Sequence, residues 1–303
     1  MTLVNVALAP DDNYAYYASV VIKSAVANSS NPENITFWIL DGGLSDKSKS
    51  ILKSSAKNVE FLLIDKEIFA DFKGKGYISI SAWYRFALSK LLPTNISKIL
   101  YLDCDIAVNC DLQEMFEIDL NNYAIGAVKD CIWKKFNKRV NLASNYHYFN
   151  SGVLLINVDY WRENKIEEKL FGFLKESPER INMLDQSVLN IVLGKEYKEF
   201  PLQWNVQYVP AYIEECCYEK QEFQSAMANP KIIHFVNRFK PWDVQLGWLN
   251  PLSVLFTKYM DNPPKYTDKK CVVFLKLFIK RFIRKPVFIF RKFYWNNIFI
   301  KRH

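Results

Sequence analysis

The sequence lacks a long uninterrupted apolar run. No stretch of 18 apolar residues occurs among its 303 residues, although half of them are apolar and 16% are aromatic. A membrane-spanning helix needs about 20 such residues, so we expect none. The first residues also lack a basic flank and a cleavage site, which argues against a signal peptide. A chain of this length and composition should instead bury a large core.

The sequence also lacks a disulfide or zinc framework. Its six cysteines stand at spacings that match neither kind of site. Reduced thiols are the ordinary state in a cytosol, so we expect a cytoplasmic protein whose cysteines pack rather than bind metal. The six are Cys104, Cys110, Cys131, Cys216, Cys217 and Cys271.

Glycine is scarce, and its nine residues form no phosphate loop. Neither G-x-G-x-x-G nor a P-loop follows the first predicted strand at residues 4–9, which argues against a dinucleotide site and a Walker-type triphosphate site. The loop that does follow is acidic. Its Asp11 and Asn13 suit hydrogen bonds to a base or ribose, and Tyr14 suits stacking on a flat ring. The alternative is that Asp12 or Asn13 simply caps the next helix.

Acidic residues are missing from the last 35 positions. Residues 269–303 hold 11 of the 40 Lys and Arg and none of the 32 Asp and Glu, so the first 268 residues carry a net charge of −3. Lys276, Lys280 and Arg284 recur every four residues, and Phe274, Phe278 and Phe282 recur on the opposite helical face. This pattern predicts a basic amphipathic helix on an anionic membrane surface, with no nucleic-acid partner. The alternative is that the tail packs on the globular domain.

Predicted strands and helices alternate along the chain, which indicates an α/β protein with a mostly parallel sheet. The predicted strands are residues 4–9, 35–40, 59–65, 99–102, 123–128, 153–158 and 232–235. The predicted helices are residues 14–27, 45–57, 81–91, 161–175, 185–193 and 251–260. Ligands bind at the carboxyl ends of parallel strands, so residues that follow these strands are the first candidates for a site.

Asp103 and Asp105 follow the apolar run Ile99–Leu102. At spacing i, i+2 in an extended chain both carboxylates project to one side. There they suit a shared divalent cation, which bridges the oxygens of a diphosphate. The alternative is an ordinary surface turn, in which Asp is common.

His234 is one of only three histidines and ends a predicted strand before Arg238 and Lys240. An imidazole beside two carboxylates favours Mn²⁺, which accepts nitrogen more readily than Mg²⁺, although Mg²⁺ remains possible. Lys240 suits a phosphate. The alternative is a buried histidine with a purely structural role.

Six motifs in this order resemble the retaining family-8 glycosyltransferases, especially bacterial enzymes that add galactose or glucose to lipopolysaccharide or lipooligosaccharide. The resemblance runs over residues 4–242 and implies a GT-A fold, a UDP-hexose donor and Mn²⁺. The motifs are ALAPDDNYAYYASVVIKSA, SISAWYRFAL, YLDCDIAV, YFNSGVLLINVDYWREN, MLDQSVLN and IIHFVNRFKPW. One position departs from the family, because relatives usually have glycine where this chain has Asn237.

The resemblance also implies a set of site residues. The metal ligands are Asp103, Asp105 and His234. The uridine contacts are Asp11, Asn13 and Tyr14, with Ala9 and Cys104 also assigned to donor binding, and Lys240 contacts the diphosphate. Arg85, Asp130, Asn150, Asp185 and Gln186 surround the donor sugar.

Retention of configuration requires either a covalent intermediate or front-face attack by the acceptor. Asp130, Asp185 and Gln186 are the candidate catalytic residues. The amide oxygen of Gln186 is a poor nucleophile and Asp185 is a better one on chemical grounds. We favour front-face attack assisted by the leaving phosphate.

These features predict a hexosyltransferase that moves glucose or galactose from a UDP-sugar to a glycan or glycolipid acceptor, such as the lipopolysaccharide core. A GT-A domain spans residues 1–262, and the membrane-associating tail of residues 263–303 places the enzyme peripherally on the inner face of the cell membrane. The alternatives are a metal-dependent sugar-nucleotidyltransferase and a non-catalytic binder of sugar nucleotides or glycans.

Overall fold

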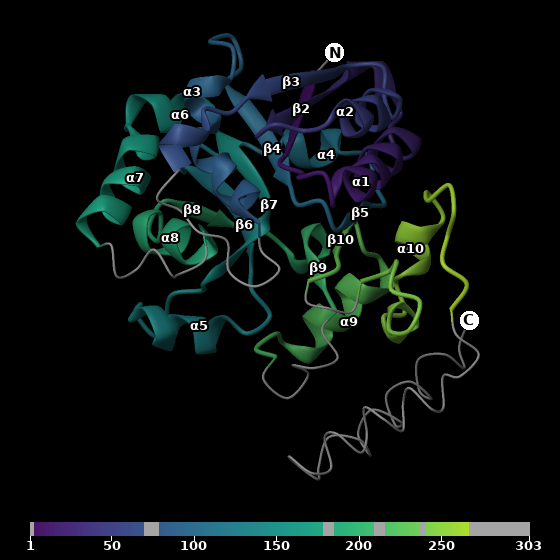
Figure 1. Cartoon of the computed structure of the whole chain (residues 1–303). Helices are drawn as coiled ribbons and strands as arrows, with labels where there is room; N and C mark the ends of the chain where they lie inside the picture. The colour runs from purple at the N-terminus through teal and green to yellow at the C-terminus, as the bar shows by residue number, and fades with distance from the viewer. Residues whose placement is uncertain (1–2, 70–78, 178–184, 209–215, 237–239, 267–303) are drawn as a thin grey trace.

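The computed structural model describes residues 3–69, 79–177, 185–208, 216–236 and 240–266 (Figure 1). Its centre is a seven-stranded sheet in the order β3-β2-β1-β4-β7-β6-β8. The strands are β1 (Val4–Leu8), β2 (Ile35–Asp41), β3 (Val59–Leu63), β4 (Lys98–Leu102), β6 (Ile125–Lys129), β7 (Phe149–Asn157) and β8 (Tyr197–Glu199). The predicted basic helix and Asn237 lie outside the described residues.

Most neighbouring strands of this sheet are parallel, as predicted, but β7 is antiparallel to both β4 and β6. β7 is also longer than the predicted strand at residues 153–158, because it begins at Phe149. Eight of its nine residues are buried, including the polar Asn150 and Ser151. Polar side chains thus lie inside the central sheet, where a sequence pattern predicts apolar ones.

Helices cover both faces of the sheet (Figure 1). Along β1, Val6 and Leu8 face a core that includes residues of α1 (Ala15–Ala27) and α2 (Asp46–Lys53), whereas Ala7 faces the opposite core. That second core is built on α3 (Leu88–Leu91), α6 (Val158–Glu163), α7 (Ile166–Glu176) and α8 (Asp185–Val192). The other helices are α4 (Gln113–Phe116), α5 (Trp133–Val140), α9 (Lys220–Ala228) and α10 (Val254–Thr257).

Three predicted helices differ from the structure. Residues 81–91 form a 3-10 segment, η3 (Ile80–Ala87), followed by the single turn of α3. Residues 161–175 form two helices, since Lys165 has a left-handed backbone (φ 53°) between α6 and α7. The predicted helix at residues 251–260 is reduced to α10. Among the described residues, no helix has the length and apolar character needed to cross a membrane.

A second, three-stranded sheet in the order β5-β10-β9 lies below the first in the view of Figure 1. It consists of β5 (Ile106–Val108), β9 (Val206–Gln207) and β10 (Ile232–His234). β10 runs antiparallel to β5 and parallel to β9, so that His234 stands opposite Ile106 on one side and Gln207 on the other. This pairing brings the end of β10 to the residue that follows Asp105.

Candidate active site

Asp103 and Asp105 occupy the turn that joins β4 to β5. The prediction that an extended backbone aligns their side chains is therefore wrong, because the turn does so. The turn is anchored at both ends: the Asp103 N–H donates to the Gly152 carbonyl at 2.8 Å, and the Asp105 carbonyl accepts from the Phe235 N–H at 2.9 Å. The central and the small sheet thus hold one aspartate each.

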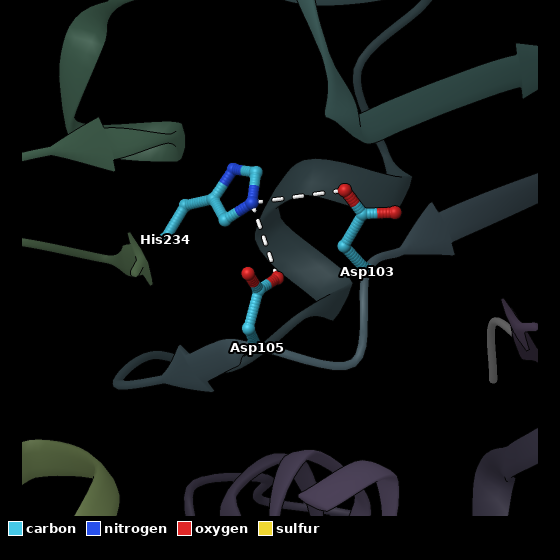
Figure 2. A group of neighbouring side chains, drawn as sticks. All are labelled: Asp103, Asp105 and His234. Carbon is cyan, nitrogen blue, oxygen red and sulfur yellow. Dashed lines mark ion pairs between the residues drawn. The ribbon is translucent and has the colours of Figure 1, made fainter. Parts of the chain in front are cut away.

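The side chain of His234 meets both carboxylates (Figure 2). Its Nε2 lies 3.6 Å from Asp103 Oδ2 and 3.2 Å from Asp105 Oδ1. One ligand atom from each residue lies within 4.8 Å of the others. Two carboxylate oxygens and one imidazole nitrogen form a donor set that suits Mn²⁺, so the residues present fit the predicted cation.

Gly152 leaves the space that this cluster occupies. A Cβ at this position would lie 2.1 Å from His234 Cε1 and 2.7 Å from Asp103 Oδ2. Any side chain there would displace the imidazole or the carboxylate, so the close approach requires glycine. Gly152 is not among the predicted site residues, although it lies inside the NSGVLL motif.

Two basic side chains flank the carboxylates. Lys240 Nζ contacts Asp105 Oδ2 and donates to the Phe235 carbonyl at 2.8 Å. Burial alone raises the pKa of Asp105, but Lys240 and His234 lower it by more, so that it lies well below its usual range. Arg85 lies 3.0 Å from Asp103 and 3.3 Å from Asp185. The Arg85 guanidinium also stacks over the Tyr101 ring at 4.1 Å.

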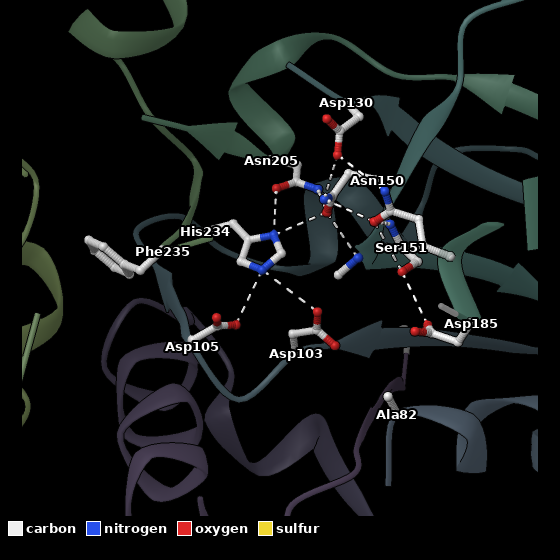
Figure 3. A network of polar contacts seen from close by, with 12 residues as sticks. Ala82, Asp103, Asp105, Asp130, Asn150, Ser151, Asp185, Asn205, His234 and Phe235 are labelled. Atoms are coloured by element: carbon white, nitrogen blue, oxygen red, sulfur yellow. Dashed lines mark hydrogen bonds and ion pairs between the residues drawn. The ribbon is translucent and has the colours of Figure 1, made fainter. Parts of the chain in front are cut away.

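The predicted sugar-binding residues form one connected network (Figure 3). Asn150 Nδ2 donates to Asp130 Oδ2 at 3.1 Å and to Gln186 Oε1 at 3.2 Å. Gln186 Nε2 donates to the same Asp130 oxygen at 3.2 Å. Burial raises the pKa of Asp130 in spite of these donors. The amide of Gln186 is therefore oriented by three neighbours, the third being the Ser151 N–H at 3.1 Å.

Asp185 is buried beside Arg85 at the start of α8. Burial raises the pKa of Asp185, and the nearby Arg85 opposes this rise. Its carboxylate is already engaged, because Arg85 Nε lies 3.3 Å and Ser151 Oγ 3.4 Å from Oδ2.

The predicted uridine residues lie around the end of β1. Asp11 Oδ1 accepts from the Tyr14 N–H at 3.0 Å, and the half-buried Tyr14 meets the Trp242 ring edge-on at 6.0 Å. Burial and the nearby Asp105 raise the pKa of Tyr14 to about 12. The capping alternative is wrong, because α1 begins at Ala15, its N-cap residue Tyr14 makes no side-chain cap, and Asp12 instead accepts from Ser45.

Ala9 and Cys104 are buried at the same edge, and Asn13 is exposed. Burial, together with the nearby charges of Asp103 and Asp105, raises the pKa of the Cys104 thiol well above its usual range. The Cys104 side chain packs in the same core as α1 and α2, as predicted for the cysteines, and its assignment to donor binding stays a prediction.

The sequence profile of Glycosyl transferase family 8 matches residues 5–245. The chain belongs to this family. It is therefore a glycosyltransferase of a retaining hexosyltransferase family.

Relatives and one solved structure extend this result. The family-8 chain is 28% identical over 243 residues to General stress protein A of Bacillus subtilis, covering 77% of this chain and 85% of that one. It is 28% identical over 280 residues to the lipopolysaccharide 1,3-galactosyltransferase of Salmonella typhimurium, covering 86% of this chain and 78% of the relative. The crystal structure of the galactosyltransferase LgtC with donor and acceptor sugar analogs matches with a TM-score of 0.73 at 24% identity, covering 89% and 100%. This likeness shows the GT-A fold.

No sequence pattern in this family-8 glycosyltransferase points to Asn205, which the predictions do not include. This residue is fully buried between the 3-10 segment η5 (Leu202–Trp204) and β9, and it contacts His234. Its neighbour Trp204 is buried in the core, with Lys231 Nζ 4.3 Å from its ring centre.

Proposed function

We propose that this enzyme transfers glucose or galactose from a UDP-hexose to a glycan or glycolipid of the lipopolysaccharide or lipooligosaccharide class. The main observation in support is the cluster of Asp103, Asp105 and His234. This cluster lies directly beside the buried polar network of Asn150, Gln186 and Asp130. A diphosphate site and a sugar site are thereby adjacent. The similarity to a lipopolysaccharide galactosyltransferase supports the acceptor class.

Asp103, Asp105 and His234 would hold Mn²⁺ or Mg²⁺. When bound, the cation supplies positive charge opposite the leaving diphosphate. Lys240 adds a cation of this chain's own at the same place, because its Nζ contacts Asp105 and is therefore within reach of an anionic group there. The uridine would lie toward Asp11, Asn13 and Tyr14, beyond the end of β1, with Ala9 and Cys104 lining that edge.

Arg85, Asp130, Asn150, Asp185 and Gln186 would surround the donor sugar. Asp130 and the amide oxygen of Gln186 would accept hydrogen bonds from the sugar hydroxyls and stabilise positive charge that develops at the anomeric carbon. Asp185 is held by Arg85 and Ser151, and Gln186 carries a neutral amide, so neither is an activated nucleophile. This supports front-face attack by the acceptor hydroxyl, with the leaving phosphate accepting its proton.

The test is to incubate the protein and Mn²⁺ with a panel of UDP-sugars and to measure the slow hydrolysis of each one as release of UDP. We expect release from UDP-glucose or UDP-galactose, its loss in EDTA, and its recovery when Mn²⁺ returns. No release from any UDP-hexose, together with tight UDP binding, would instead identify a non-catalytic binder. Family membership argues for glycosyl transfer over nucleotidyl transfer.

We also propose that the tail of residues 263–303 attaches the catalytic domain to an anionic inner membrane surface. Its charge pattern supports this, because residues 269–303 hold 11 basic residues and no acid. The globular contacts of the chain reach at least Tyr266, whose hydroxyl donates to the Pro241 carbonyl at 2.8 Å. Any truncation should therefore keep that residue.

A further inference from the structure

Asn205 lies on the side of the His234 ring that faces away from the two carboxylates (Figure 3). Its Oδ1 is 3.2 Å from His234 Nδ1, and its Nδ2 donates to Asn150 Oδ1 at 3.0 Å. Asn205 is fully buried, and Asn150 and His234 are buried beside it. A buried amide in this position has its hydrogen-bonding partners fixed by its surroundings.

The direction of these hydrogen bonds follows from one backbone group. The Gly152 N–H donates to Asn150 Oδ1 at 3.0 Å, which identifies that atom as the oxygen of the amide. Asn205 must then present its NH₂ group to Asn150 Oδ1, and its own oxygen to the imidazole. His234 Nδ1 therefore faces two oxygens, Asn205 Oδ1 and, at 3.1 Å, Asn150 Oδ1.

A nitrogen that faces two acceptors carries the hydrogen. In a neutral imidazole the lone pair is then on the other nitrogen, Nε2, which is the atom nearest to Asp103 and Asp105. Partners on the far nitrogen commonly orient a metal-binding histidine and fix its tautomer.

We propose that Asn205 is a positioning residue for the metal site. Its oxygen holds His234 in the Nδ1–H tautomer and directs Nε2 at the space shared with Asp103 and Asp105. The inference rests on the proposed function, since it assumes that the cluster binds a cation. Asn150 takes part in the same contact, but it also holds Gln186 and Asp130, so Asn205 is the cleaner residue to test.

Two substitutions separate positioning from packing. Asn205→Leu keeps the branched shape of the side chain and removes its acceptor. Asn205→Asp keeps an acceptor for Nδ1–H but places a charge in the core and loses the donor to Asn150. If Asn205 only filled space, the leucine variant would resemble wild type and the aspartate variant would be the worse of the two. A positioning role predicts the reverse order for Mn²⁺ binding, with the leucine variant binding the cation more weakly than the aspartate variant.

The measurement is UDP binding by calorimetry at a series of Mn²⁺ concentrations, with thermal unfolding of each protein. For Asn205→Leu we expect the Mn²⁺ concentration at half-effect to rise about 10- to 100-fold, whereas Asn205→Asp should stay several-fold closer to wild type. The matched control is Asn137→Leu, which removes another buried amide, one that bonds only to the backbone of Ala143 and Tyr146 in the described structure. Its Mn²⁺ dependence should match wild type.

The outcomes are distinct. The positioning role is overturned if Asn205→Leu has the same Mn²⁺ concentration at half-effect as wild type. It is also overturned if Asn205→Asp needs as much Mn²⁺ as Asn205→Leu, or more. If Asn205→Leu does not fold, Asn205→Ser replaces it, because its hydroxyl is too short to reach Nδ1 from the same backbone. Wild-type protein whose UDP binding ignores Mn²⁺ contradicts the proposed function itself.

Discussion

Buried polar groups are satisfied in two different ways in the two parts of the chain. In residues 3–69, the side chains of Ser19, Ser55 and Asp41 bond to groups two to eight residues away. Around the candidate site, Asn150 bonds to residues 20 and 36 positions away, and His234 bonds to Asn150 across 84 positions. These three side chains therefore depend on local structure, whereas those of the candidate site depend on the complete tertiary structure.

This difference decides how far the effect of a substitution spreads. A locally bonded group affects its own turn, so its loss should add independently to other changes. In the network each side chain orients the next, from His234 through Asn150 to Gln186, and removing one leaves the others unsatisfied in a buried place. The cost should therefore appear in both metal binding and turnover.

The largest expected effect comes from a matched pair of aspartates. Asp105→Asn or His234→Ala should reduce hexose transfer by at least about a thousandfold, because the leaving diphosphate loses its counter-charge. Asp41→Asn changes a carboxylate that is also buried, at the end of β2, but whose partners among the described residues are Lys49 and its own turn. We expect this control to keep nearly wild-type turnover, measured as UDP release.

Near-wild-type turnover of Asp105→Asn in the presence of EDTA would reject the metal site. Equal losses in Asp105→Asn and Asp41→Asn would instead show that the two parts of the chain are not independent.

A pair of glycines gives the next effect. Gly152→Ala should lower transfer about a hundredfold and weaken Mn²⁺-dependent UDP binding, since the new methyl group displaces His234 or Asp103. Gly172→Ala in α7 has open space, and it should raise the free energy of unfolding by about 0.5–1 kcal/mol without changing turnover. Kinetics and thermal unfolding of both variants check this. Wild-type activity of the Gly152→Ala enzyme would mean that the Asp103, Asp105 and His234 cluster tolerates the displacement caused by the methyl group.

Gln186 tests the sugar side of the network. Gln186→Ala should lower kcat about a hundredfold, while the affinity for UDP changes by no more than about threefold, because the amide would contact only the sugar. Asp185→Asn should behave in the same way, with some loss of order at its partner Arg85. The two quantities are separated by single-turnover kinetics and UDP calorimetry. A parallel collapse of UDP affinity would place Gln186 at the diphosphate instead.

The same contrast explains what the sequence allowed us to predict. The parallel strands and the Asp103–Asp105 pair follow local patterns, an apolar run and then polar residues, and the structure has both. The start of β7 was missed because Asn150 and Ser151 look like loop residues. Asn205 was missed for the same reason, since nothing within a few positions indicates that its partners are Asn150 and His234, 55 and 29 residues away.

A smaller effect concerns stability and pH. Burial alone raises the pKa of Asp41, but Lys49 and the N–H groups of Leu44 and Gly43 lower it by more, so the folded protein favours the carboxylate. A lowered pKa stabilises the fold above the unfolded-state value of about 3.9, and this contribution disappears as the pH falls below it. Wild type should exceed Asp41→Asn by about 1–2 kcal/mol near pH 6, and the difference should shrink below about pH 4. Denaturant unfolding at several pH values measures this, and a constant difference would contradict it.

The smallest effect on catalysis is expected from removing the tail. A chain that ends after Asp268 keeps Tyr266 and its contact with Pro241, together with the ion pair between Asp261 and Lys23. We therefore expect it to fold, to hydrolyse UDP-sugar at the wild-type rate, and to stop sedimenting with anionic vesicles.

Each basic residue near such a surface contributes about 1 kcal/mol, so half of the 11 would give roughly 5 kcal/mol. Salt should release the full-length protein only in part, because screening weakens the charge interactions and leaves aromatic insertion in place. Neutral vesicles are the control. A truncated chain that aggregates, beside a full-length protein that ignores both kinds of vesicle, would show that the tail completes the folded domain.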